Sequence, residues 1–285
     1  MSAHVTPVGP ALLFCPGERA ERFEKAVAGS DIAVLDLEDG TSEPNKETAR
    51  ASVCAFVAAT GADVIVRINH PAGDRGIRDL QALKDARARR LLLPKTETVQ
   101  EIDAVCSTWS GGEPELILTI ETAKGLIALP HLLAHPAVAG VSWGPYDMAA
   151  DICARSVRDE AGNLRSTFRY ARDRLLLEAA AFAIPVFDTV TVELSDPTMT
   201  IRDSAEAAEL GFAGKFCIHP SQVDPIRRAF QPSQKQIDWA TRLLAESGSH
   251  GAALFDGDMV DEPMLRRARR ILQQQDRFPT GPAHG

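Results

Sequence analysis

The chain has 285 residues, and its composition is that of an ordinary folded protein. Hydrophobic residues make up 45% of the sequence and charged residues 25%, which excludes a largely disordered chain, a collagen and a coiled coil. The 31 basic and 39 acidic side chains give a net charge of −8, so nucleic acid and anionic membrane surfaces are unfavourable partners. No apolar run approaches the roughly 18 residues that a membrane helix needs, and we predict a cytoplasmic protein.

Five cysteines are spread along the chain without any Cys-x-x-Cys pair. This spacing argues against a disulfide framework and against a thiolate zinc site. We therefore predict reduced, buried thiols at Cys15, Cys54, Cys106, Cys153 and Cys217.

Short apolar runs alternate with helical patterns along most of the chain. The runs that predict strands are 11–15, 32–37, 64–68, 91–93, 116–120, 138–143, 184–188 and 215–218. The segments that predict helices are 18–28, 43–59, 77–88, 98–107, 122–133, 168–183 and 204–210, and helix C-caps are expected at Gly29, Gly61 and Gly211. This alternation predicts an α/β fold, a closed (β/α)8 barrel, with an open doubly wound sheet as the alternative. No Gly-x-Gly-x-x-Gly follows the first strand, so a dinucleotide site has little support.

Two stretches extend this repeating pattern. Residues 151–169 are longer than the other connections and predict an elaborated loop over one barrel end. After the last strand, residues 232–236 predict a capping box that opens a helix to about residue 246. A glycine-rich loop at 248–257 and a basic helix at about 263–274 follow, so we divide the chain into a barrel core, 1–220, and a last barrel helix with a helical extension, 221–285.

Charged and polar residues stand where each predicted strand ends. In a barrel, these ends converge on the face where active sites lie. Burying several acids together is costly unless they are paired or bind a cation. The residues concerned are Asp36, Glu38, Asp39, Arg67, Asn69, Lys95, Glu121, Asp147, Asp188 and His219.

Carboxylates without a cluster of histidines or cysteines suit a hard cation such as Mg²⁺ or Mn²⁺. Glu121 and Asp147 end neighbouring strands and could share one such ion with several waters. The planar fork of Arg67 suits a substrate carboxylate, and a salt bridge to Glu38 or Asp39 is its alternative role. Lys95 could likewise pair with those two acids instead of contacting substrate.

Taken in order, these motifs resemble the citrate lyase β-subunit-like branch of the HpcH/HpaI aldolase superfamily. The resemblance covers about residues 11–272 and is carried by 12–17, 36–39 with Lys46 and Arg50, 66–69, 93–95, 120–125, 143–147, 211–215, 218–222, 232–233 and 257–263. It implies a TIM barrel and a Mg²⁺-dependent carbon–carbon lyase that acts on a β-hydroxyacyl-CoA thioester such as malyl-CoA or citramalyl-CoA. The implied products are acetyl-CoA or a related acyl-CoA and a 2-keto acid.

The resemblance also implies roles for individual residues. Glu121 and Asp147 match the metal ligands, and Arg67 matches the contact to the substrate carboxylate. Asp261 matches an acid/base carboxylate that some relatives supply from a neighbouring subunit, and a helix N-cap is its alternative role. The candidate catalytic residues are Asp261, Arg67, Glu38 and Asp39, and the candidate substrate contacts are Arg67, Glu121, Lys95 and Pro145. A homo-oligomer, trimer or hexamer, is implied, with the C-terminal extension packing on a neighbour.

Three other functions stay open from the sequence. They are a metal-dependent aldolase on free 2-keto-3-deoxy acids, a subunit of a citrate lyase complex, and a non-catalytic protein that binds CoA or a keto acid. The stretches around Asp261 and 36–39 favour the CoA-dependent branch, and the intact pair of Glu121 and Asp147 argues against a non-catalytic barrel. This chain has Pro10-Ala11 where relatives usually have Arg-Ser, so one basic contact is missing.

Overall fold

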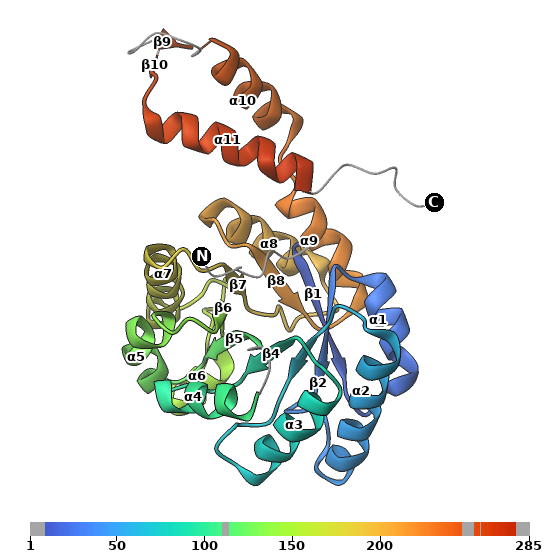
Figure 1. The fold of residues 1–285 in the computed structure, drawn as a ribbon. Helices are drawn as coiled ribbons and strands as arrows, with labels where there is room; N and C mark the ends of the chain where they lie inside the picture. The colour runs from blue at the N-terminus through green and yellow to red at the C-terminus, as the bar shows by residue number, and fades with distance from the viewer. Residues whose placement is uncertain (1–8, 110–113, 247–253, 257, 278–285) are drawn as a thin grey trace. The chain divides into compact units, whose positions relative to one another are not determined.

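The structure is a computed structural model that describes residues 9–109, 114–246, 254–256 and 258–277. The chain divides into two compact units, Met1–Ile226 and Arg227–Gly285. In Figure 1 the first unit is a ring of strands surrounded by helices.

Eight parallel strands form the barrel, and the first strand closes the ring by pairing with the last. They are β1 (Ala11–Pro16), β2 (Ile32–Asp36), β3 (Ile65–Arg67), β4 (Arg90–Leu93), β5 (Glu115–Ile120), β6 (Val138–Trp143), β7 (Val186–Asp188) and β8 (Gly214–Cys217). Each strand pairs with the strand that follows it in the sequence. The predicted closed barrel is therefore confirmed, and the open doubly wound alternative is wrong.

The helices of this unit follow the strands in turn. They are α1 (Phe23–Gly29), α2 (Lys46–Thr60), α3 (Asp74–Asp85), α4 (Val99–Thr108), α5 (Ala123–Leu133), α6 (Pro145–Asp151), α7 (Ser166–Ala181) and α8 (Pro197–Leu210), with short 3-10 turns η1 (Ala20–Arg22), η2 (Glu43–Asn45) and η3 (Pro220–Gln222). Helix α9 (Val223–Phe230) begins in this unit and ends in the second. Gly61 and Gly211 end α2 and α8 in the left-handed conformation, as predicted. Gly29 instead lies within α1, and the extended Ser30 ends that helix.

The sequence pattern misplaces two helical segments. Helix α8 begins at Pro197 and not at 204, because Asp196 caps it by accepting a hydrogen bond from the Thr198 N–H at 2.8 Å. The pattern also predicts no helix at α6, a short element that begins with Pro145. Consequently the long connection is shorter than expected and spans residues 152–165 between α6 and α7.

Apolar side chains fill the inside of the barrel. The buried cluster consists of Leu12, Ile32, Val34, Ile65, Leu92, Ile117, Phe187 and Phe216. Phe14 stacks on Phe216 with the ring centroids 5.2 Å apart, one layer further along β1. A barrel of eight strands is just wide enough for side chains to fill it, so ligands must bind at an end and not within.

The second unit pairs two helices around a small core of its own. It contains α10 (Gln234–Glu246), β9 (Leu254–Phe255), β10 (Asp258–Met259) and α11 (Glu262–Arg277), and its buried side chains are Ile237, Ala240, Leu243, Phe255, Ala268 and Ile271. The predicted capping box is confirmed, since the Ser233 N–H donates to Gln236 Oε1 at 2.8 Å and the Gln236 N–H donates back to Ser233 Oγ at 3.3 Å. Most of the predicted glycine-rich loop at 248–257 lies outside the described residues.

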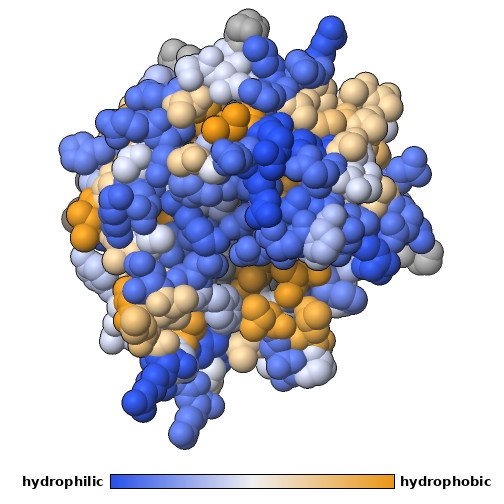
Figure 2. Space-filling view, turned by 90° about the horizontal axis from the view of Figure 1, so that it is seen from below, coloured by the Kyte–Doolittle hydropathy of each residue, from blue (hydrophilic) through white to orange (hydrophobic). Residues whose placement is uncertain are grey.

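Two further expectations concern surface and redox character. Within the described ranges, no helix is both long and apolar enough to cross a membrane. Seen from below, the surface is mainly hydrophilic with separate apolar patches (Figure 2). The five cysteines form no disulfide, and the prediction of a buried thiol is confirmed for Cys15 and Cys217. Cys54 and Cys106 are half-buried, and the prediction is wrong for Cys153, which is exposed in a left-handed turn just after α6.

Candidate active site at the barrel mouth

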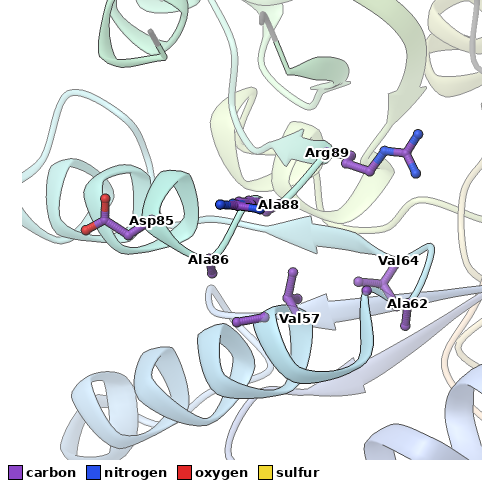
Figure 3. A pocket seen from close by; sticks show the side chains of 10 residues that line it. Val57, Ala62, Val64, Asp85, Ala86, Ala88 and Arg89 are labelled. Carbon is purple, nitrogen blue, oxygen red and sulfur yellow. The ribbon is translucent and has the colours of Figure 1, made fainter. Parts of the chain in front are cut away.

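Two cavities lie at opposite ends of the barrel, and only one of them contains the predicted site residues. The cavity at the carboxyl ends of the strands has a volume of about 100 Å³ and is lined by Phe14, Arg67, Leu92, Thr119, Glu121, Ser142, Trp143, Gly144, Tyr146, Asp147, Thr189, Val190 and Phe216. A larger cavity of about 430 Å³ lies at the amino ends of β3 and β4, with small apolar side chains and exposed charged residues around it (Figure 3). Active sites of such barrels lie at the carboxyl ends, so the smaller cavity is the candidate site.

Arg67 is held in the mouth by two acids from the end of β2. Its Nε and NH2 groups donate to the two carboxylate oxygens of Asp36 at 2.8 and 2.6 Å. Its NH1 group lies 3.0 Å from Glu38 Oε2. Although burial opposes the charge on Arg67, these two carboxylates keep its pKa above the usual range. The alternative role as a salt bridge is thus present in part, with Asp36 and Glu38 as the partners and not Asp39.

This clamp does not use all of the hydrogen-bonding capacity of Arg67. A guanidinium carries five N–H groups, and Asp36 takes only two of them. The guanidinium also stacks over the ring of Phe14, 4.7 Å from its centroid. Glu38 Oε2 is buried and accepts no hydrogen bond within the described structure. Oriented donors therefore remain for an anionic ligand.

Lys95 forms the turn after β4 and adopts a left-handed backbone with φ of 50°. This turn directs its N–H group at Glu121 Oε1, 2.8 Å away. Its ammonium lies 2.6 Å from Glu38 Oε1, 3.7 Å from Asp39 Oδ2 and 3.3 Å from Asp147 Oδ1. The alternative role of Lys95, pairing with the acids after β2, is therefore what the structure shows.

Glu121 and Asp147 stand close together where β5 and β6 end. Glu121 is 3% exposed, and burial, followed by the charge of Asp147, raises the pKa of its carboxyl group to about 8. Between them lies Gly144, where a Cβ atom would be only 2.3 Å from Glu121 Oε2. Pro145 opens α6 and does not line the cavity, so its predicted contact with substrate stays a prediction.

A short helix fixes the position of Asp147. Helix α6 carries Asp147 in its first turn and ends at Asp151. The carboxylate of Asp151 accepts a hydrogen bond from the N–H of Ala123 at 2.8 Å, and Ala123 begins α5 two residues after Glu121. The two segments that carry the paired carboxylates are thereby joined to each other.

The donor chemistry of this pair suits a divalent cation. Among the described residues, no group of three or more His, Cys, Asp or Glu side chains has the arrangement of a metal site. Two carboxylates with further ligands from water and substrate are the usual arrangement for Mg²⁺. Burial and the charge of Asp147 raise the pKa of Glu121 more than Lys95 lowers it, and a cation between the two carboxylates would favour their charged forms.

The expectation that all strand-end residues meet at the mouth is wrong for Asp188 and Asn69. Alternation along β7 places Phe187 inside the barrel, so Asp188 faces outward, where it binds Trp143 Nε1 at 2.8 Å and Arg172 at 2.9 Å. Asn69 likewise faces the surrounding helices, where its Nδ2 donates to Asp79 at 2.7 Å. These residues stabilise the outer face of the barrel, where the strands pack against the surrounding helices.

Two other candidates have structural contacts. The His219 ring caps η3 by accepting a hydrogen bond from the Ser221 N–H at 3.2 Å. In the second unit, Asp261 Oδ1 accepts a hydrogen bond from the Met264 N–H at 2.9 Å. The N-cap role proposed for Asp261 as the alternative is therefore present, and its acid/base role stays a prediction.

Sequence reasoning assigns no role to Lys46, although this residue belongs to a motif that carries the resemblance. Its ammonium is buried and donates to the carbonyl oxygens of Leu37 and Glu38 at 2.8 and 2.6 Å. It thereby fixes the loop from which Glu38 reaches Arg67. A lysine in the first turn of a predicted helix gives no signal of such a contact, because the contact depends on how the loop folds back.

Comparison with known proteins agrees with this architecture. The sequence model of the HpcH/HpaI aldolase/citrate lyase family matches residues 11–220, which is most of the barrel unit. The chain belongs to the HpcH/HpaI aldolase/citrate lyase family. The family resemblance deduced from the motifs is confirmed.

Individual proteins are similar to this chain over nearly its full length. The citrate lyase subunit beta-like protein of Mycobacterium tuberculosis is 36% identical over 267 residues, which cover 93% of this chain and 95% of that protein. The mitochondrial citramalyl-CoA lyase of Rattus norvegicus is 32% identical over 291 residues, covering 92% of this chain and 84% of its own. The crystal structure of the protein CitE from M. tuberculosis, in complex with magnesium, acetoacetate and coenzyme A, matches with a TM-score of 0.85 and 34% identity, covering 97% and 100% of the two chains.

Proposed function

We propose that this protein is a Mg²⁺-dependent carbon–carbon lyase. It cleaves a β-hydroxyacyl-CoA of the malyl-CoA or citramalyl-CoA type into acetyl-CoA, or a related acyl-CoA, and a 2-keto acid. The observation that carries the proposal is the pair of Glu121 and Asp147 beside Arg67 at the mouth of the barrel. The similarity to a citramalyl-CoA lyase and to a structure with magnesium, a keto acid and coenzyme A supports it.

The charge of the mouth supports the need for a metal. Five carboxylates face two basic side chains there, which leaves a formal excess of three negative charges when all five acids are ionised. The acids are Asp36, Glu38, Asp39, Glu121 and Asp147, and the bases are Arg67 and Lys95. An anionic keto acid or thioester would be repelled by this excess. A divalent cation held by Glu121 and Asp147 reverses much of that repulsion.

Each residue then has a definite task. The cation supplies Lewis acidity toward substrate oxygens, the usual contribution of Mg²⁺ in such chemistry. Glu121 and Asp147 hold it through carboxylate oxygens, and the remaining N–H groups of Arg67 orient the substrate carboxylate. Asp36 keeps the guanidinium in one plane by its two hydrogen bonds. Asp261 would donate a proton to the carbon that becomes the methyl group of acetyl-CoA, and would remove that proton in the condensing direction.

The proposal is tested by measuring keto-acid release from a small panel of substrates. The panel contains malyl-CoA, citramalyl-CoA, 3-hydroxy-3-methylglutaryl-CoA and the corresponding free acids, each with and without Mg²⁺. We expect cleavage of a thioester only, and loss of activity without metal or in a Glu121→Ala variant. Retained activity in that variant contradicts the metal assignment.

The same panel separates the alternatives. Cleavage of free acids alone assigns the protein to the aldolases. Binding of keto acid without any cleavage indicates that a carrier partner is required or that the barrel is non-catalytic. We also propose a homo-oligomer, a trimer or hexamer, which light scattering of the intact protein measures.

A further inference from the structure

Lys95 contacts both carboxylates of the proposed metal site, and it does so with two different parts of the residue. Its main-chain N–H donates to Glu121 Oε1 at 2.8 Å. Its side-chain ammonium lies 3.3 Å from Asp147 Oδ1 and 2.6 Å from Glu38 Oε1. The left-handed backbone that makes both contacts possible is unfavourable for a residue with a Cβ atom, so the surrounding structure must enforce it.

We propose that the Lys95 ammonium is the resident cation of the mouth, which neutralises Asp147 until a divalent ion binds and displaces it. The main-chain bond to Glu121 is kept in both states. Lys95 is on this view a competitor of the metal and not a contact for substrate. The inference rests on the proposed metal site.

Geometry makes the two cations competing partners of Asp147. Mg²⁺ binds carboxylate oxygens at about 2.1 Å. An ion bound to Asp147 Oδ1 would therefore lie no more than about 5.4 Å from the ammonium as it stands. At that separation, the repulsion between a charge of +2 and a charge of +1 lowers the affinity for the divalent ion even in a water-like dielectric.

The mouth provides a place for the displaced ammonium. Glu38 Oε1 already contacts it at 2.6 Å, and Asp39 Oδ2 lies 3.7 Å away on the exposed side. The Lys95 side chain is 34% exposed, and its four-carbon stem is flexible, so a small rotation moves it from Asp147 toward Asp39. This assigns Glu38 and Asp39 a task, which is to hold Lys95 away from the ion.

Removing the charge of Lys95 should strengthen the binding of a divalent ion, whereas removing a metal ligand would weaken it. A Lys95→Met variant keeps the backbone N–H that binds Glu121, and methionine meets the same backbone strain as lysine. It loses the competing charge together with the ammonium's contacts to Glu38 and Asp39, neither of which is a proposed metal ligand, so the affinity for a divalent ion should increase. Coulomb repulsion in a water-like dielectric at this distance corresponds to about a tenfold increase.

The experiment measures Mn²⁺ binding to the full-length protein without substrate, by electron paramagnetic resonance. We expect Lys95→Met to bind Mn²⁺ about tenfold more tightly than the wild type, and Lys95→Arg, which keeps the charge, to stay within about threefold of it. Lys124→Met is the matched control, since Lys124 is exposed and pairs with Glu97, outside the cavity lining. Unchanged or weaker binding in Lys95→Met overturns the inference.

A Glu121→Gln variant separates this inference from the proposed function. Loss of Mn²⁺ binding in Glu121→Gln shows that the measured ion occupies the mouth. Retained binding in Glu121→Gln overturns the metal site itself, and the inference with it. Tight binding in wild type that depends on Glu121 but is weakened by Lys95→Met overturns only the role of Lys95.

Discussion

Gly144 lies against Glu121, and its replacement by alanine tests the metal site by steric means alone. A Cβ atom at this position would be 2.3 Å from Glu121 Oε2 and 2.8 Å from Glu121 Cβ. The backbone of Gly144 has φ of −121°, which alanine adopts without strain. The substitution therefore forces the Glu121 carboxylate to move, and because Glu121 Cβ is fixed to the main chain, the ends of β5 and β6 must also separate slightly.

The size of that displacement follows from ordinary contact distances. Non-bonded contacts need about 3.4 Å or more, so the carboxylate of Glu121 must move by about 1 Å. Misplacing a reacting or ligating group by 1 Å costs on the order of 10²-fold in rate, which corresponds to about 2.7 kcal/mol. We expect Gly144→Ala to lower kcat for keto-acid release by about that factor and to weaken Mn²⁺ binding in parallel.

Gly29→Ala is the matched control for this substitution. A Cβ atom on Gly29 meets nothing within 4 Å, and this residue lies in the last turn of α1. We expect unchanged kcat and a stability equal to or slightly above that of the wild type. Wild-type kcat and Mn²⁺ affinity in Gly144→Ala would refute the claim that Glu121 binds the metal from this position.

Three further predictions concern individual carboxylates, namely Asp36, Asp261 and Glu121. Asp36→Asn removes the charge that clamps Arg67, and we expect KM for the thioester to increase about tenfold or more, measured by steady-state kinetics. Asp261→Asn keeps a good helix N-cap, so the melting temperature should stay within about 2 °C while kcat falls at least about 100-fold; unchanged kcat would leave only the capping role. Because Glu121 without metal has a pKa of about 8, a divalent ion must displace its proton at lower pH. Mn²⁺ affinity should therefore fall by up to about tenfold per pH unit below 8 and level off above it, and a flat profile between pH 6 and 9 would contradict this.

The barrel and the acidic pair could be predicted from the sequence because both depend on patterns within short stretches of the chain. Alternating strand and helix patterns leave few topologies. Glu121 directly follows β5, and Asp147 lies four residues after the neighbouring β6. Asp188 also ends a strand, yet it faces outward. Deciding this needs the face of each residue, and a three-residue strand such as β7 offers too short an alternation to read.

The finer geometry could not be predicted, since it arises from contacts between distant segments. The left-handed turn at Lys95 has no sequence signal, because lysine is not a residue that favours this conformation. The same holds for Gly144, whose missing Cβ matters only because Glu121 lies against it. The start of α8 is different, because Asp196-Pro197 is a readable cap signal that the helical pattern alone overlooks.

The tether between Asp151 and Ala123 has a consequence for how this protein can diverge. It closes α6 onto α5, so the segments that carry Glu121 and Asp147 are complete before the 152–165 connection begins. That connection has bonds of its own, among them one from Arg158 to the Gly162 carbonyl oxygen at 2.7 Å. It is also bonded to α8, where Arg158 pairs with Asp203 at 2.7 Å and Arg202 donates to the Ala161 carbonyl oxygen at 3.2 Å. Exchanges at the exposed positions of 152–165 can therefore accumulate without altering the acidic pair, provided that the bonds of Arg158 and Arg202 between this segment and α8 are kept.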